Sequence, residues 1–141
     1  MKCWAFSARA GRLGSMNADL QPLALILDDS PFLALHLAQQ LGALGLRAQR
    51  TASREELLTL AGSAAVVLIE LQQFAANGFQ VTRELASSCS CPIILLSGTG
   101  RSTDLHWGLR AGARAVLTRP VQASALHSAL QQLGCCGEAC P

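Results

Sequence analysis

The stretch Ala65-Val66-Val67-Leu68-Ile69-Glu70 places an acidic residue directly after five consecutive apolar residues. A run that is apolar at every position is typical of a strand buried on both faces, as the strands of parallel sheets are. Three further apolar runs end at polar side chains: residues 23–27 at Asp28 and Asp29, residues 92–96 at Ser97, and residues 115–117 shortly before Arg119. Because ligands of open parallel sheets bind at the carboxyl ends of the strands, these side chains are predicted to share one site.

Amphipathic segments separate the apolar runs. Residues 31–41 carry Leu33, Leu37 and Leu41 at helical spacing, after a Ser30-Pro31 start signal and before Gly42 and Gly45. Similar helical patterns cover residues 53–61, 79–86, 102–111 and 121–133, and a more polar strand is predicted at residues 46–50. Alternating strands and helices indicate an α/β fold in which helices cover both faces of a parallel sheet.

Two helix starts carry specific side-chain signals. Ser53 and Glu56 have the spacing of a capping box, in which the serine hydroxyl accepts from the third helical N–H and the glutamate reaches back. For the segment that ends near Ala111, Ser102 or Thr103 is the predicted N-cap.

Composition excludes several classes of function. Half of the 141 residues are apolar, only 14% are charged and the net charge is +2. Residues 20–133 hold eight Arg against seven acids, so nucleic-acid binding is not expected. The longest apolar runs are far shorter than the roughly 20 residues of a membrane span, and the N-terminus lacks a signal-peptide core. We therefore expect a cytoplasmic protein with no membrane partner.

The periodic pattern divides the chain into three parts. Residues 1–21 show neither period and are predicted to be a flexible extension, with Met16 as an alternative start to Met1. Residues 22–133 form the predicted domain, and residues 134–141 a Cys-rich tail. The six Cys residues lie mostly outside the regular pattern, which indicates free thiols in a reducing compartment. With so few residues after Leu133, we expect no attached output domain.

The ordered motifs resemble the receiver domain of two-component response regulators over about residues 22–133. The matching pieces are Leu25-Ile26-Leu27-Asp28-Asp29-Ser30, Leu68-Ile69-Glu70-Leu71 with Gly78, Leu95-Leu96-Ser97-Gly98, Ala111-Gly112-Ala113 and Leu117-Thr118-Arg119-Pro120. The resemblance implies a doubly wound, flavodoxin-like, five-stranded parallel sheet of order 2-1-3-4-5. It also implies a role in phosphorelay signal transduction, with a histidine kinase or a downstream signalling protein as partner.

In that family the acid pair and the acid after the third strand hold Mg²⁺, and the latter, an Asp, accepts a phosphoryl group. Carried over, the metal positions are Asp28, Asp29 and Glu70, and the hydroxyl that binds phosphoryl oxygens is Ser97. Mg²⁺ prefers such oxygen ligands, while a hydroxyl and a cation neutralise the developing charge.

Three positions depart from the family pattern. Glu70 replaces the phosphoacceptor Asp, Arg119 replaces the Lys, and Val116 stands where an aromatic residue is common. The extra methylene of Glu moves its carboxylate by more than about 1 Å, which exceeds what in-line transfer tolerates. We expect Arg119 to form a bidentate pair with Glu70 and to compete with weak Mg²⁺ binding. The hypothesis is an atypical receiver, or pseudo-receiver, that acts independently of phosphorylation.

Other interpretations stay open. Glu70 and Arg119 would be a vestigial salt bridge in the simplest one, and a working Mg²⁺-dependent phosphoacceptor site in another. A thiol-based metal or redox sensor would use Cys135, Cys136 and Cys140 in the tail. Because His36, His106 and His127 lie on separate helices, no catalytic triad is predicted and the protein is not expected to be an enzyme.

The resemblance also predicts an interaction surface. In receivers the fourth helix, fifth strand and fifth helix commonly contact partners or a second copy of the chain, and here that surface would include Leu105, Leu109, Val116 and Gln122. Trp107 cannot face the sheet together with Leu105 and Leu109, so at least one large side chain should be partly exposed. Exposed apolar groups of this kind mark interaction surfaces.

Overall fold

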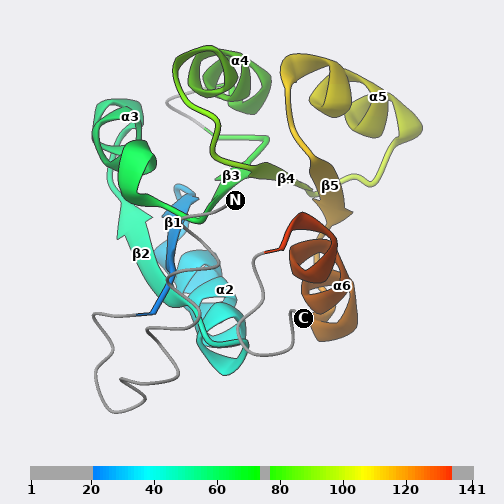
Figure 1. Cartoon of the computed structure of the whole chain (residues 1–141). Coiled ribbons are helices and arrows are strands. Elements are labelled where there is room, and N and C mark those ends of the chain that lie inside the picture. The colour runs from blue at the N-terminus through cyan, green and yellow to red at the C-terminus, as the bar shows by residue number, and fades with distance from the viewer. Residues whose placement is uncertain (1–20, 74–76, 135–141) are drawn as a thin grey trace.

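The computed structural model describes residues 21–73 and 77–134, in which strands alternate with helices (Figure 1). The strands are β1 (Leu23–Leu27), β2 (Arg47–Thr51), β3 (Val66–Glu70), β4 (Ile93–Ser97) and β5 (Ala115–Thr118). The helices are α2 (Pro31–Ala43), α3 (Arg54–Leu60), the short 3-10 helix η2 (Ala61–Ser63), α4 (Gly78–Ser88), α5 (Ser102–Ala111) and α6 (Ala123–Leu133).

The strands form one parallel sheet in the order β2-β1-β3-β4-β5. Every residue of β1, β3 and β4 is buried, as the continuous apolar runs predict, whereas β2 at one edge is half-buried or exposed at most positions. The predicted doubly wound, flavodoxin-like sheet with helices on both faces is confirmed.

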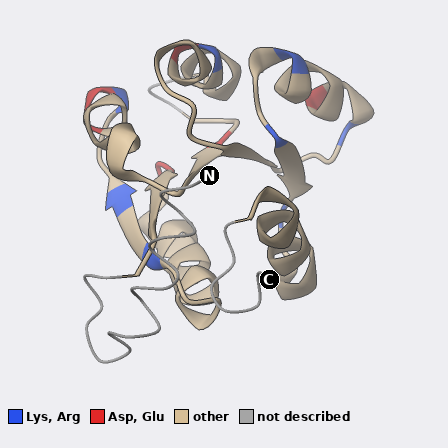
Figure 2. Cartoon of the chain, in the orientation of Figure 1, with Lys and Arg blue, Asp and Glu red and all other residues tan. Residues whose placement is uncertain are grey.

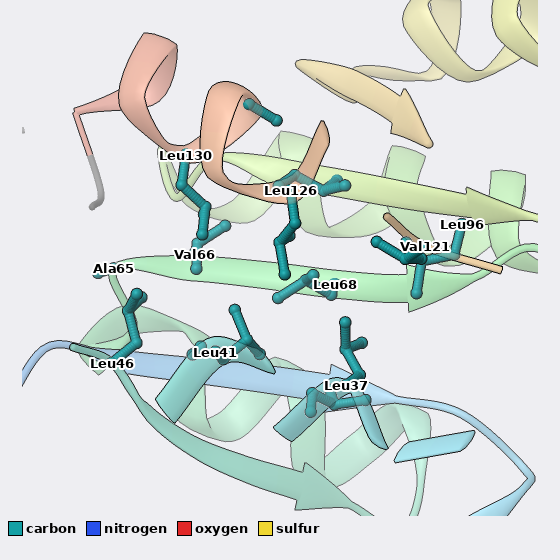
Figure 3. Close-up of a cluster of buried hydrophobic side chains, with 14 of the residues drawn as sticks. Leu37, Leu41, Leu46, Ala65, Val66, Leu68, Leu96, Val121, Leu126 and Leu130 are labelled. Atoms are coloured by element: carbon teal, nitrogen blue, oxygen red, sulfur yellow. The ribbon is translucent and has the colours of Figure 1, made fainter. Parts of the chain in front are cut away.

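Alternate residues of the strands supply two separate cores. Ala24, Ile26 and Leu68 face α2 and α6, where side chains such as Leu41 and Leu126 interdigitate with them (Figure 3). Leu25, Val67 and their neighbours face the other layer, which contains α3, α4 and α5 (Figure 1). Each fully buried Leu or Ile contributes about 1.5–3 kcal/mol of transfer free energy, so the two layers hold the sheet from both sides.

Some helix ends differ from prediction. Ser30 and Ser53 cap α2 and α3 as expected, by accepting from the amides of Leu33 at 3.2 Å and Glu56 at 3.1 Å. The N-cap of α5 is Arg101, so the prediction of Ser102 or Thr103 is wrong, because Ser102 already lies within the helix. Helix α6 begins at Ala123 and not at Val121, because Gln122 takes the extended backbone of the N-cap and Val121 packs into the first core.

Charged side chains are unevenly distributed. Helices α2 and α6 contain no Lys, Arg, Asp or Glu, while α3, α4 and α5 carry both signs (Figure 2). Across residues 21–73 and 77–134, none of the helices combines the length and the apolar character that a membrane crossing requires.

Candidate functional site at the carboxyl ends of the strands

The strand ends bring Asp28, Glu70, Ser97 and Arg119 to one edge of the sheet, and we call these four residues the strand-end site. The sheet register explains the placement, since Glu70 pairs with Leu96 and Ser97 pairs with Thr118. Asp28, Glu70 and Ser97 are 5%, 2% and 1% exposed. Burial this deep requires each polar group to have a partner.

Arg119 bridges the two buried carboxylates. Its Nη2 forms an ion pair with Oε1 of Glu70, and its Nη1 lies 3.8 Å from Oδ2 of Asp28. The predicted pairing with Glu70 is present, but it is not bidentate, because the second guanidinium nitrogen faces Asp28. One cation therefore faces carboxylates at two strand ends, while its own side chain is 21% exposed.

Backbone amides hold both carboxylates in place. Oε2 of Glu70 accepts from the amide of Gln72 at 3.2 Å, and Oδ1 of Asp28 accepts from the amide of Ser30 at 2.9 Å. Arg50 on β2 stabilises the adjoining loop by donating to the carbonyls of Asp28 at 3.0 Å and Asp29 at 3.2 Å. Sequence reasoning missed Arg50, because an arginine on an edge strand reads as a solvated side chain.

Burial raises the pKa of the Glu70 carboxyl above its ordinary value. The amide of Gln72 and the charge of Arg119 act in the opposite direction, and the nearby charge of Asp28 adds to the increase. The Gln72 amide and the Arg119 charge therefore both favour the charged form of Glu70, against the effect of burial.

The predicted metal ligands do not fit a Mg²⁺ site as they stand. Among the described residues, no three His, Cys, Asp or Glu side chains are gathered so that they could hold a metal ion. The guanidinium of Arg119 faces both Asp28 and Glu70, while Asp29 is exposed. Weak binding of Mg²⁺ through Asp28, Asp29 and Glu70 stays a prediction.

Ser97 is turned toward helix α5. Its Oγ donates to Oδ2 of Asp104 at 2.6 Å and accepts from the amides of Thr99 at 3.2 Å and Gly100 at 3.1 Å. Oγ1 of Thr99 also donates to Oδ2 of Asp104, at 2.6 Å. Hydrogen bonds from Ser97 and then Thr99 hold the pKa of the Asp104 carboxyl below its usual range.

Asp104 was not predicted as part of the site. The available signal is an acid in the first turn of the helix that follows two hydroxyl residues, Ser97 and Thr99. Such an acid ordinarily reads as favourable charge at a helix N-terminus, so the sequence alone favours that simpler role.

Two cavities adjoin the strand-end site. One of about 340 Å³ lies beside Asp28 and Asp29, between residues of α3 and α4 that include Arg54 and Glu84. Another of about 410 Å³ is bounded by Leu33 and Leu37 of α2 and by Arg119. Arg119 thus lines a largely apolar space as well as pairing with the carboxylates.

The predicted interaction residues differ in exposure. Leu105 and Leu109 on α5 are 46% and 47% exposed, and Trp107 between them is 52% exposed. Gln122 is exposed as the N-cap of α6, whereas Val116 is half-buried and packs against the second core. Val116 therefore contributes more to packing than to a free surface.

The thiol hypothesis is largely outside the described residues, since Cys3, Cys135, Cys136 and Cys140 are not among them. Neither Cys89 nor Cys91 forms a disulfide within the described residues, and both are half-buried near the start of β4. The Sγ of Cys91 donates to the carbonyl of Ala64 at 3.4 Å, which is a packing contact at the amino end of the sheet.

Comparison with known proteins agrees with the geometry. Residues 24–131 match the family of the response regulator receiver domain. Protein PilH of Pseudomonas aeruginosa is 35% identical over 107 residues, which are 72% of this chain and 88% of PilH. The transcriptional regulatory protein AfsQ1 of Streptomyces coelicolor is 27% identical over 112 residues, or 78% of this chain but only 50% of AfsQ1.

Solved structures show the same fold. The signal receiver domain of a modulated diguanylate cyclase from Desulfovibrio desulfuricans has a TM-score of 0.69 at 25% identity, covering 80% of this chain and 93% of that one. The chemotaxis protein CheY4 of Vibrio cholerae has a TM-score of 0.71 at 21% identity, covering 80% and 98%, and this likeness is one of fold. The chain belongs to the response regulator receiver domain family of two-component signalling.

Proposed function

We propose that this receiver is a stand-alone protein-interaction module that works without phosphorylation at Glu70. The observation that carries the proposal is the bridge from Arg119 to Glu70 and Asp28. In this arrangement the cation already faces the carboxylates that would otherwise collect a metal ion and a phosphoryl group. The site would then keep one fixed arrangement and would not be poised to accept a phosphoryl group.

Two chemical properties of Glu70 support this proposal. Its carboxylate sits farther from the backbone than that of Asp, so an attacking oxygen would be displaced from the in-line position. It is also almost completely buried and held by Gln72 and Arg119, which limits how far it can move. Glu70 supplies a negative charge near the phosphoryl position, but with one charge and two oxygens this is incomplete mimicry.

The partner is proposed to be a histidine kinase or a downstream signalling protein, with a second copy of the chain as the alternative. Leu105, Leu109, Val116 and Gln122 are the residues proposed to contact it. The proposed working unit is residues 22–133 in the cytoplasm, flanked by an N-terminal extension and a Cys-rich tail. Neither nucleic acid nor a membrane is proposed as a partner, and no catalytic activity is assigned.

Incubation with acetyl phosphate and Mg²⁺, followed by intact-mass analysis, tests the proposal. Wild type should gain no mass, and a phosphorylatable receiver treated in parallel verifies the reagent. Glu70→Gln is the matched negative control. An acid- and base-labile gain of one phosphoryl group in wild type, mapped to Glu70 and absent from Glu70→Gln, would contradict the proposal.

A working phosphoacceptor is the second candidate, because Asp28 and Ser97 keep the residue types of the family pattern at their strand ends. It would form a slow acyl phosphate with Mg²⁺, and the same mass experiment decides between the two functions. Titration with Mg²⁺ adds an independent observation. Amide shifts of Asp28 and Asp29 that stay unchanged would remove the metal prediction.

A further inference from the structure

The hydroxyl of Ser97 has no free hydrogen-bonding capacity. A serine hydroxyl has one proton to donate and two lone pairs. Here the proton goes to Asp104, at 2.6 Å, and the lone pairs accept from the amides of Thr99 and Gly100. Any other acceptor, including an anion bound beside Arg119, must displace Asp104 to receive the Ser97 proton.

Asp104 binds this hydroxyl strongly. Hydrogen bonds from hydroxyl groups to carboxylates at such short distances are charge-assisted and about twice as strong as neutral ones. The same oxygen, Oδ2, also accepts from Thr99 at 2.6 Å. We call Ser97, Thr99 and Asp104 the Asp104 cluster. The two hydroxyls close the loop between β4 and α5 onto one carboxylate.

The position of Asp104 connects two regions of the molecule. Ser97 ends β4 within the strand-end site and is 1% exposed. Asp104 lies in the first turn of α5, the helix whose outer surface carries Leu105, Trp107 and Leu109. The hydrogen bond from Ser97 to Asp104 therefore joins the buried end of β4 to the helix that presents the exposed apolar side chains.

We propose that Asp104 is a positioning residue that holds the Ser97 hydroxyl on the α5 side and thereby fixes α5 relative to the strand-end site. The inference rests on the proposed function, because it supplies a second restraint on the same site beside the Arg119 bridge. The two restraints are chemically independent, since within the described part of the chain no hydrogen bond or ion pair joins Asp104 to Arg119 or Glu70. Displacing Asp104 would free both the Ser97 proton and the start of α5.

Variants of the full chain, studied without any phosphoryl donor, test this inference. Asp104→Ala removes the acceptor, Asp104→Asn keeps an oxygen at the same position, and Thr103→Ala changes an exposed neighbour on the same helical turn. The measurements are amide hydrogen exchange of Thr99 and Gly100, and the resonance of the Trp107 indole N–H.

With Asp104→Ala, exchange at Thr99 and Gly100 should accelerate roughly tenfold, as expected when one net hydrogen bond is lost. The Trp107 signal should shift in this variant and in Ser97→Ala. Asp104→Asn should restore most of the protection, with less than about a threefold change, because an amide oxygen still accepts. Thr103→Ala should leave all three signals as in wild type.

A double-mutant cycle over Ser97→Ala and Asp104→Ala separates coupling from general damage. If the cluster acts as a unit, the double variant should unfold no more readily than the worse single variant. Additive effects, or an Asp104→Ala result equal to that of Thr103→Ala, would overturn the inference. A phosphoryl group found on wild-type Glu70 would refute the proposed function but leave this cycle unaffected, so the two failures are distinguishable.

Discussion

Arg119 faces two carboxylates that are almost completely buried, so loss of its charge should be costly. Arg119→Met keeps much of the aliphatic stem but leaves Glu70 and Asp28 without their cation. Removing one partner of a fully buried pair costs about 3–5 kcal/mol, and the partial exposure of Arg119 reduces this to about 2–3 kcal/mol of unfolding free energy. Urea unfolding measures the loss.

Arg54 is the matched control for this experiment. Its Nη1 lies 2.7 Å from Oε1 of Glu84, but both side chains are 39% exposed, so Arg54→Met should cost much less than Arg119→Met. Adding Glu70→Gln to Arg119→Met should recover part of the loss, since one uncompensated charge disappears. Equal destabilisation by the two arginine variants would show that the Arg119 bridge is an ordinary surface pair.

The raised pKa of Glu70 gives a second prediction, with a definite sign. The unfolded chain releases this proton near pH ~4.3, while the folded protein retains it to higher pH. Between these two values the native state binds more protons, so the Glu70 contribution to the free energy of unfolding falls as pH rises. Glu70→Gln should remove this fall, as measured by urea unfolding across acidic pH.

Glu55→Gln serves as the control of opposite sign. Hydrogen bonding to its own backbone amide, followed by Arg54, lowers the pKa of Glu55. Any contribution of Glu55 should therefore be present above the ordinary pKa and diminish as pH falls. A wild-type profile that Glu70→Gln leaves unchanged would mean that burial does not govern the Glu70 proton.

The positions of the site residues and the pairing of Arg119 with Glu70 were predictable, but the other contacts of these residues were not. Asp28, Glu70 and Ser97 each end a continuous apolar run. If these runs are parallel strands, their carboxyl ends lie at the same edge of the sheet, and so do the three residues. The bridge of Arg119 to Asp28, and the turn of Ser97 toward Asp104, depend on side-chain conformations set by neighbouring loops. Those loops follow different strands, and local sequence patterns carry little information about how side chains from different loops are placed relative to one another.

Helix α4 begins in close contact with the loop that leaves β3. A Cβ at Gly78 would lie 2.6 Å from Cα of Leu71 and 2.9 Å from the carbonyl oxygen of Glu70. Both neighbours are backbone atoms, which cannot rotate away. Gly78→Ala should therefore cost about 1–3 kcal/mol, measured by thermal or urea unfolding, and should displace the loop that carries Gln72.

Gly42 in α2 provides the comparison, because a Cβ there meets nothing within 4 Å. Gly42→Ala should increase stability by about 0.5–1 kcal/mol through the higher helix propensity of Ala. If Gly78→Ala behaved like Gly42→Ala, the close approach of α4 to the strand-end site would be refuted.

The helix boundaries show where local signals are sufficient. Ser30 and Ser53 cap their helices with side-chain oxygens, as the spacing predicts. Before α5, the hydroxyls of Ser97 and Thr99 donate to the carboxylate of Asp104 in the first helical turn and do not cap the helix. The N-cap of α5, Arg101, makes no side-chain cap hydrogen bond, so a Ser or Thr close to a helix start is not always its N-cap.

The two helical layers have different surfaces. Helices α2 and α6 carry no charged side chain (Figure 2). Helix α2 nevertheless exposes Phe32 and Leu35, at 77% and 58%. Helix α5 belongs to the other layer, carries both signs of charge and exposes Leu105, Trp107 and Leu109. The apolar periodicity of the helices predicted both layers, because the apolar face of each helix packs into one of the two cores. It did not decide which exposed apolar group contacts a partner, since α2 also exposes large side chains.

Paired substitutions on the two layers test the proposed contact surface. Leu105→Glu with Leu109→Glu places charge on α5, and Phe32→Glu with Leu35→Glu does the same on α2 as a matched control. Burying an unpaired carboxylate in an apolar contact is strongly unfavourable, so the α5 variant should lose its partner while the α2 variant retains it. Affinity capture from the native host, followed by mass spectrometry, identifies the partner, and sedimentation equilibrium detects a second copy of the chain. The circular dichroism spectrum should be unchanged in both variants. Loss of binding in the α2 variant alone would contradict the proposed surface and would place the interface on the layer formed by α2 and α6.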